Sequence, residues 1–245
     1  MALYQLIIDY DGTHFLGFQR QARGRTVQGE IEKALLELGW KGSSILAAGR
    51  TDAGVHASGQ VIAFELDWPH EPEKLQSALN ARLAQDVVVK KTSIAEKGFH
   101  PRFDATQRTY HYRIYCSAQR NPLLERFAWQ VWPKVEIARL NAAAGELIGK
   151  HDFCAFGRPL KDEAGTVRTV VQAQWRRSTP GWLFEITANA FLYHMVRRLV
   201  YVQVKYAQGF IDLAEIRNAL RTGCRIKPGM APACGLELAE VSYKK

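Results

Sequence analysis

GRTDAGVHA, residues 49–57, joins two stretches that predict strands, residues 45–48 before it and 61–64 after it. The glycines of this loop permit backbone angles that are closed to other residues, and they let a ligand approach the main chain closely. Its one carboxylate, Asp52, is either a residue that shapes a turn or a reactive group. The local sequence alone favours the turn, because Asp is common in turns.

Hydrophobic periodicity on both sides of this loop predicts an α+β protein. Strands are predicted at residues 4–10, 87–92, 103–115, 169–177, 182–188 and 236–243, and helices at 26–38, 73–83, 137–148, 193–207 and 212–220. Short turns join many neighbouring strands, which favours mainly antiparallel sheet. We expect two mainly antiparallel subdomains of similar build, residues 1–105 and residues 106–245, with the active-site cleft between them.

Charge is distributed unevenly along the chain. The 33 Lys and Arg exceed the 24 Asp and Glu by nine. Residues 1–105 hold 12 of the basic and 13 of the acidic side chains, so residues 106–245 carry the excess. A folded chain with a basic half favours a polyanionic partner, with nucleic acid ahead of an acidic membrane. The alternative is a positive surface that only aids solubility.

Cysteine usage and hydropathy exclude several classes of protein. The four cysteines, Cys116, Cys154, Cys224 and Cys234, are spaced too widely for a zinc knuckle or a redox pair. Such a composition is typical of a reducing compartment, and we expect a cytoplasmic protein. The first residues lack the features of a signal peptide, and charged residues interrupt the most apolar stretch, 191–204. No motif for a phosphate, a dinucleotide or a metal is recognised, so no cofactor and no metal are expected.

Two further segments carry side chains that could act on a ligand. In the predicted strand 103–115, alternation places Arg108, Tyr110 and Tyr112 on one face. Tyrosines on strands usually serve packing, but aromatic side chains among arginines can also stack on bases. In the predicted helix 193–207, Arg197 shares an apolar stripe with Val200 and Val204. Such an arginine either extends to solvent or pairs with an anion, and Asp52 is the anion that we consider.

Eight segments in collinear order resemble the bacterial tRNA pseudouridine synthase A family, and together they span nearly the whole chain. They are residues 9–13, 17–21, 26–30, 49–57, 99–103, 108–112, 191–197 and 231–236. Each segment alone is a weak signal, whereas eight in order are strong. The chain departs from the family pattern at Phe18, where Trp is typical, and at residues 198–201, where Asn and later Gly are common. Tyr201 in particular is bulky where close helix packing is usual.

The resemblance implies a reaction and a set of site residues. Asp52 matches the catalytic aspartate, Tyr110 the active-site tyrosine and Arg197 the basic partner of the aspartate. Matching substrate-binding positions are Arg50, which is thought to help displace the target base, together with Asp11, Gln19 and His56. The implied function is isomerisation of uridine to pseudouridine in the anticodon stem-loop of tRNA, at positions 38–40, by a homodimer that needs no cofactor. The resemblance leaves open which uridines and which tRNAs are modified, and how Asp52 acts.

Competing interpretations differ in what they require of the sequence. An RNA-binding module without catalysis would use Asp52 for a turn and Arg197 for a structural salt bridge, and a synthase of this group could act on another RNA. A methyltransferase would need a glycine-rich cofactor loop after an early strand, and a metal-dependent nuclease would need clustered carboxylates. The chain offers only Asp9 and Asp11 near its first turn, so the last two classes are disfavoured.

Overall fold

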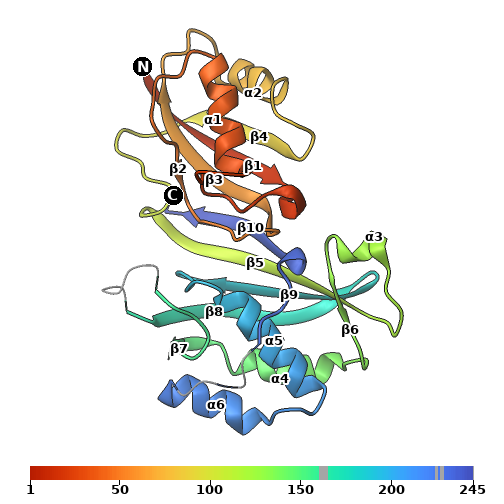
Figure 1. Ribbon diagram of the computed structural model, residues 1–245. Coiled ribbons are helices and arrows are strands. Elements are labelled where there is room, and N and C mark those ends of the chain that lie inside the picture. Colours follow the sequence, from red (N-terminus) through yellow and green to blue (C-terminus); the bar gives the residue numbers. More distant parts are fainter. Residues whose placement is uncertain (160–164, 224–225, 227–228, 245) are drawn as a thin grey trace. The chain divides into compact units, whose positions relative to one another are not determined.

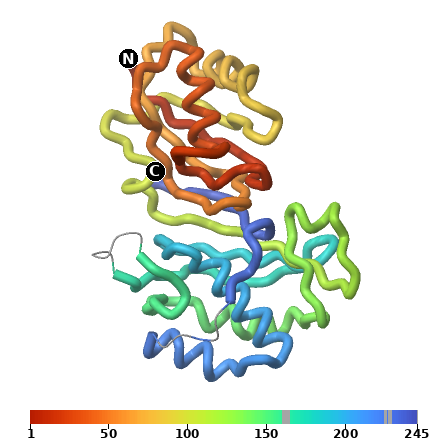
Figure 2. The backbone as a smooth tube through the Cα atoms, viewed as in Figure 1, coloured from red at the N-terminus to blue at the C-terminus, as the bar shows by residue number. Residues whose placement is uncertain are grey.

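The computed structural model describes residues 1–159, 165–223, 226 and 229–244 (Figure 1). The chain divides into two compact units, Met1–Thr106 with Glu237–Lys245 and Gln107–Leu236. The last strand therefore returns to the first unit, where its blue trace runs beside the orange strand in Figure 2. This differs from the sequence-based division, which assigned residues 106–245 to one subdomain. Hydrogen bonding to a distant strand is the reason, and linear spacing carries no signal of it.

The first unit is built on a mainly antiparallel sheet. Its strands are β1 (Ala2–Tyr10), β2 (Leu46–Ala47), β3 (His56–Leu66), β4 (Val87–Ile94) and β10 (Leu236–Tyr243). Their order is β4-β1-β3-β10, with β2 paired to β3. The β1–β3 and β1–β4 pairs are antiparallel, whereas β10 runs parallel to β3. Strand β3 therefore lies between β1 and β10, and its first residues, His56 and Ala57, are the end of the GRTDAGVHA segment.

Two helices cover one face of this sheet (Figure 1). Helix α1 (Val27–Glu37) begins after Thr26, whose hydroxyl caps the helix by accepting a hydrogen bond from the Gly29 N–H. Helix α2 is Pro72–Asn80. The core beneath them is formed by side chains with no exposed area, among them Leu6, Ile8, Ile31, Leu35, Ile62, Leu75 and Leu79. A short 3₁₀ turn, η1 (Gly12–His14), follows β1 directly.

In the second unit the strand order is β5-β9-β8-β7. These strands are β5 (Ala105–Cys116), β7 (Gly149–Asp152), β8 (Val167–Ser178) and β9 (Gly181–Ala188), and the β5–β9, β8–β9 and β7–β8 pairs are antiparallel. The short β6 (Trp129–Val131) runs parallel to β5. Its helices are α3 (Pro122–Glu125), α4 (Ile137–Gly145), α5 (Met195–Ala207) and α6 (Leu213–Thr222), and a 3₁₀ turn, η2 (Ala233–Gly235), precedes β10.

Helix α5 and the sheet of the second unit share a buried core. The indole N–H of Trp175 on β8 donates to the Gln203 side chain of α5 at 2.8 Å, and both residues are buried. Trp175 also stacks on Phe184 of β9, with the ring centroids 5.0 Å apart. Phe184 is in turn the cross-strand partner of Tyr112 on β5. This core fixes the strand that carries Tyr110 against the helix that carries Arg197.

The α+β class and the mainly antiparallel sheets are confirmed, while several predicted boundaries need correction. Strand β3 already begins at His56, so the end of the GRTDAGVHA segment is strand and not loop. Strand β5 begins at Ala105, not at 103. Helix α5 begins at Met195, not at 193, because His194 has a left-handed backbone with φ 65°. The short elements β6, β7 and α3 were not predicted.

Candidate active site

The main chain around Asp52 is held on both sides by hydrogen bonds. The carbonyl oxygen of Thr51 accepts from the Phe18 N–H at 3.0 Å. The carbonyl oxygen of Asp52 accepts from the Val55 N–H at 3.1 Å, which closes a turn, and Gly54 N–H donates to Phe15 O at 3.3 Å. Asp52 is partly exposed at the tip of this turn. The interpretation of Asp52 as a turn residue is therefore correct for its backbone, and the residue is partly exposed in this turn.

Buried side chains fix the two ends of the loop. The Tyr10 hydroxyl lies 2.7 Å from the Thr51 hydroxyl, and the Tyr10 ring is buried. At the other end, the Gln60 amide accepts from the Gly49 N–H at 3.2 Å and donates to the Gly49 carbonyl at 2.9 Å. Gln60 has no exposed area, so its amide takes the place of a strand partner for Gly49. Sequence reasoning missed these residues, although a Gln beside the apolar run 61–64 was a usable signal.

The turn after β1 is hydrogen-bonded to the end of the Asp52 loop, through Gly12 and His56. The Gly12 N–H donates to Nδ1 of His56 at 3.1 Å. The His56 side chain is buried, and Nδ1 also lies 3.1 Å from the Asp11 carboxylate. Asp11 caps the turn by accepting from the Thr13 N–H at 3.0 Å. These contacts position the loop, and direct RNA contacts of Asp11 and His56 stay a prediction.

We expect Gly12→Ala to lower turnover by about 10²-fold, because a misplacement of about 1 Å in a catalytic group costs that much. A Cβ at Gly12 would collide with the Val55 carbonyl oxygen, three residues after Asp52. The test is turnover at saturating tRNA, together with the melting temperature. Gly145→Ala is the matched control, since a Cβ there meets no atom within 4 Å. Wild-type turnover of Gly12→Ala would contradict a positioning role for this turn.

The first residues of helix α1 are hydrogen-bonded to Gly17 and Phe18, and Phe18 is in turn hydrogen-bonded to Thr51. Val27 N–H donates to Gly17 O at 3.3 Å, and Gln28 N–H donates to Phe18 O at 2.9 Å. Gly17 has φ 96°, and a Cβ on it would lie 2.8 Å from the Thr51 carbonyl oxygen. The Phe18 ring is buried and lies 6.3 Å from the Tyr10 ring. Phenylalanine thus supplies the aromatic packing at a position where the family pattern has Trp.

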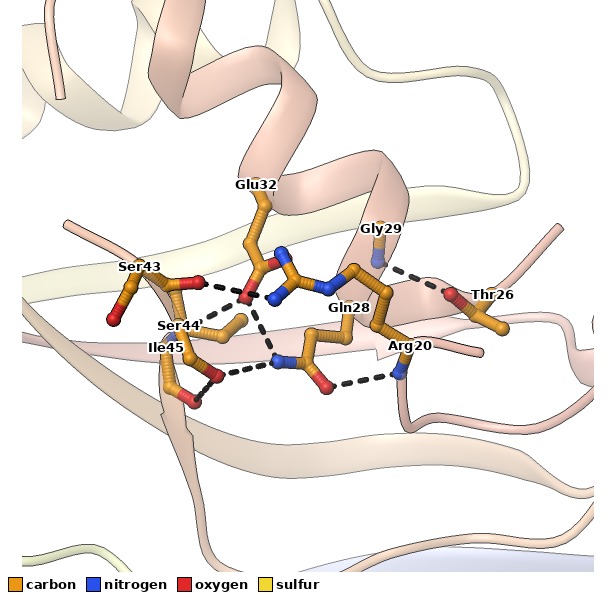
Figure 3. Close-up of polar contacts among 8 residues, drawn as sticks. All are labelled: Arg20, Thr26, Gln28, Gly29, Glu32, Ser43, Ser44 and Ile45. Carbon is orange, nitrogen blue, oxygen red and sulfur yellow. Dashed lines mark hydrogen bonds and ion pairs between the residues drawn. The ribbon is translucent and has the colours of Figure 1, made fainter. Parts of the chain in front are cut away.

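A buried carboxylate joins the same helix to the strand that leads into the loop (Figure 3). Glu32 is buried, and its Oε1 accepts from the Ile45 N–H at 3.1 Å and from the Gln28 amide at 2.8 Å. Its Oε2 pairs with the Arg20 guanidinium at 2.5 Å. Arg20 N–H donates to the Gln28 side chain at 2.9 Å (Figure 3). The neighbouring Gln19 is exposed, as is Arg50, two residues before Asp52.

Arg25 connects the end of this segment to the start of β4. Its guanidinium forms two hydrogen bonds to Asp86, at 2.5 and 2.8 Å, and lies 4.3 Å from the centre of the Phe15 ring. The bonds to Arg25 lower the pKa of the Asp86 carboxyl below its ordinary value of 3.8. The ionised form is therefore favoured by folding, and the pair stabilises the protein above pH 3.8.

Asp86→Asn should reduce the free energy of unfolding by about 1–3 kcal/mol at neutral pH. Since the folded-state pKa is the lower one, the difference from wild type should shrink as the pH falls from 3.8 through that folded value. Urea unfolding at a series of pH values measures this. Glu37→Gln is the control, because Glu37 pairs with Arg82 at 3.5 Å on the surface, where a pair contributes less than about 1 kcal/mol. A difference between Asp86→Asn and wild type that does not change with pH would contradict the assignment.

Tyr110 lies on β5 in the second unit, on the face that the sequence predicted. Its cross-strand partner is Ile186, and those of Arg108 and Tyr112 are Ala188 and Phe184, all three buried. The Tyr110 ring is partly exposed and meets Phe191 edge to face, with the centroids 5.0 Å apart. Tyr112 is fully buried, and burial raises the pKa of its phenol well above the ordinary value. Tyr112 is thus a core residue, while Tyr110 is partly exposed.

Arg197 is partly buried near the start of α5 and is bound to the segment before η2. Its Nε–H donates to the Ala231 carbonyl at 2.8 Å, and the Ala231 N–H donates back to Arg197 O at 3.1 Å. The Tyr112 hydroxyl donates to the Pro232 carbonyl at 2.7 Å. These bonds explain why residues 231–236 belong to the motif set, since they orient Arg197. Asp52 is in the other unit, so its ion pair with Arg197 stays a prediction.

The bulky Tyr201 on α5 is accommodated by its surroundings. Its ring stacks on Trp129 of β6 at a centroid distance of 6.4 Å, with an angle of 13° between the planes. On another side, Gly229 lies so close that a Cβ would collide with the Tyr201 ring. The space for the Tyr201 ring is therefore provided by Gly229, which lies outside the helix, whereas the family pattern has a glycine within the helix.

The remaining sequence predictions concern metals, cysteines and membranes. Cys116, Cys154 and Cys234 form no disulfide, and Cys224 lies outside the described residues. Within the part of the chain that the structure describes, His, Cys, Asp and Glu side chains form no group of three that could hold a metal ion. In that same part, no helix has the length and apolarity needed to cross a membrane.

Comparison with known proteins assigns the chain to a family. A solved structure titled "Crystal Structure of a Cbf5-Nop10-Gar1 Complex" resembles it only weakly, with a TM-score of 0.38, 14% identity, and coverage of 96% of this chain and 49% of that chain. A tRNA pseudouridine synthase A from Streptococcus equi subsp. equi is 39% identical over 249 residues, 100% of both chains. One from Pseudothermotoga lettingae is 38% identical over 245 residues, 99% of this chain and 100% of that protein. The family model described as tRNA pseudouridine synthase matches residues 6–104 and 143–244, and the chain belongs to that family.

Proposed function

We propose that the chain isomerises uridine at positions 38–40 in the anticodon stem-loop of tRNA, with Asp52 as the catalytic residue and no cofactor. Family membership makes the chain an isomerase that converts uridine in tRNA to pseudouridine. The observation that carries the assignment of Asp52 is its place in a turn held by hydrogen bonds with two other motif segments, at Gly12 and Phe18, and with Phe15 between them. A catalytic carboxylate requires such fixed positioning.

The reaction needs no change of oxidation state and no donor of a group. The bond from C1′ to N1 breaks, the base rotates, and C1′ joins C5, which loses its proton while N1 gains one. Asp52 acts as the nucleophile at C1′, at C6, or as the base that takes a proton from the sugar. Tyr110, with its partly exposed ring, packs on the displaced base and assists removal of the C5 proton. Arg197 pairs with the Asp52 carboxylate and orients it.

Access to the target requires the base to leave its stack, which costs a few kcal/mol. Arg50 and Gln19 are exposed: Arg50 lies two residues before Asp52, and Gln19 follows Phe18, whose N–H is bound to the Thr51 carbonyl. Both positions suit contacts to the displaced nucleotide. The basic excess of residues 106–245 offsets the cost through phosphate contacts, which carry no sequence information. The choice among uridines then depends on the shape of the folded RNA.

The working form that we propose is a cytoplasmic homodimer that grips one tRNA across both subunits. The family resemblance supports the homodimer. The location of the tRNA substrate supports the cytoplasm. Sedimentation of the protein with and without tRNA tests this part independently of the chemistry, and a monomer that turns over tRNA at the full rate would contradict it.

The experiment that tests the assigned positions uses tRNA with uridine tritiated at C5. Release of tritium reports isomerisation, and substrates in which the uridines at 38, 39 and 40 are replaced by cytidine, singly and all together, report where it occurs. We expect release only from substrates that keep at least one of these uridines. Release that is unchanged when all three are replaced would contradict the anticodon stem-loop as the target while leaving the class of reaction intact.

A further inference from the structure

The segment Phe99–Phe103 is a motif that the catalytic reading leaves without a role. It lies in the first unit, between β4 and β5. Phe103 at its end is 75% exposed, which is high for a phenyl group. Within residues 95–104, all of which the structure describes, it is the one exposed large hydrophobic side chain. A phenyl group placed in water on a motif segment calls for a physical explanation.

The backbone that carries Phe103 is tightly organised. His100 N–H donates to the Asp104 carboxylate at 2.7 Å, and Asp104 N–H donates to His100 O at 3.1 Å. His100 Nδ1 accepts from the N–H groups of Arg102 and Phe103, at 3.1 and 3.4 Å. These bonds close a compact turn, so the exposure of Phe103 is a property of a fixed conformation.

The base of this turn is anchored on the C-terminal strand. The Tyr243 hydroxyl donates to the Pro101 carbonyl at 2.8 Å, and the Tyr243 ring meets Phe99 edge to face at 5.1 Å. Pro101 is buried. The anchored base and the exposed tip give the segment the form of a rigid support with one aromatic ring at its end.

The surroundings of the ring determine which partner suits it. The His100 ring lies 4.2 Å from the Phe103 ring, centroid to centroid, at an angle of 39°. The exposed Arg102 places its guanidinium carbon 6.0 Å from the same centroid. Aromatic rings that continue a partial stack, with a cation alongside for phosphate, are the features with which proteins hold unpaired bases.

We propose that Phe103 is a stacking platform for an unpaired nucleobase of the tRNA substrate. Its ring receives the face of a base, the His100 ring continues the stack behind it, and Arg102 contacts the adjoining phosphate. A contact with another protein would need a contiguous apolar patch, whereas the ring has the charged Arg102 beside it, with the guanidinium carbon 6.0 Å from the ring centre. The proposal rests on tRNA being the substrate, but not on which uridine is isomerised.

Equilibrium binding of tRNA, which needs no turnover, tests this proposal. Alanine at a base-stacking position costs roughly 1–3 kcal/mol, so Phe103→Ala should raise the Kd by about 5- to 150-fold. Phe103→Trp should keep the wild-type Kd because it keeps an aromatic face, whereas Phe103→Leu should behave like the alanine variant. Wild-type affinity in Phe103→Leu would overturn stacking in favour of simple apolar contact.

The salt dependence of binding separates stacking from charge. Phe103→Ala should leave the slope of log Kd against log salt unchanged, whereas Arg102→Gln should reduce it by about one phosphate contact. Phe127→Ala is the matched control, since this phenyl group is 43% exposed and has the Arg126 guanidinium 5.5 Å from its ring centre. Equal loss of affinity in Phe127→Ala and Phe103→Ala would overturn a specific site at Phe103.

Two further results with the Phe103→Ala variant would contradict a stacking platform. Wild-type tRNA affinity of Phe103→Ala would overturn the proposal directly. A change in oligomeric state of Phe103→Ala by sedimentation, with the affinity per protomer unchanged, would assign the ring to a contact between copies of the chain. If tritium release at positions 38–40 failed while the Phe103 series behaved as expected, the assigned target would be wrong and the platform would stand.

Discussion

Replacing Asp52 with alanine is expected to abolish isomerisation, with turnover at least roughly 10⁴-fold below wild type, while affinity for tRNA stays nearly unchanged. The loss is large because the proposed chemistry has no second group that could replace the carboxylate at C1′, at C6 or at the sugar proton. The affinity is spared because phosphate contacts supply most of the binding free energy. The structure supports this separation, since the Asp52 turn is held by backbone bonds that an alanine keeps, at Thr51 O and Asp52 O.

Tritium release and equilibrium binding, measured on the same preparations, provide the test. The control is Asp67→Ala, which removes a carboxylate that is 93% exposed in the same unit and should leave both quantities unchanged. A parallel loss of turnover and affinity in Asp52→Ala would contradict the division of labour proposed here. Full turnover would return Asp52 to the role of a turn residue.

Arg197→Lys is expected to lower turnover by about 10²-fold. Lysine keeps the charge but lacks the planar fork of donors. In the structure, Nε of Arg197 is bound to the Ala231 carbonyl, and this bond orients the guanidinium. A lysine would give up this orientation, and an ion pair with Asp52 would lose its fixed geometry.

The matched control is Arg198→Lys, which makes the same change one residue later in α5, at a similarly partly exposed position. We expect the control to keep most of its turnover. The effect of Arg197→Lys should appear in kcat and not in the affinity for tRNA, because the arginine acts on the carboxylate and not on phosphates. Equal losses in the two variants would show that the helix is merely sensitive to lysine at its start.

Sequence reasoning found the elements more readily than their ends. Helix α1 and strand β10 were predicted because their periodicity and their flanking turn residues agree. Short elements such as β6 and β7 were missed, since three or four residues hold too little pattern. The start of α5 was misplaced because Tyr193 pairs with Arg158, a residue 35 positions earlier, and His194 turns the backbone before the helix begins.

The sequence by itself determined the class of fold, the family, the Asp52 loop and the face of β5 that carries Tyr110. These follow from local periodicity and from motifs whose order is legible along the chain. Only the tertiary structure decided that Gly12, Phe18 and Gln60 hold the loop, that Ala231 orients Arg197, and that β10 belongs with the first unit. Each of these depends on a hydrogen bond or a close approach between residues far apart in the chain. Such contacts produce no periodic pattern along the sequence, so the sequence alone does not predict them.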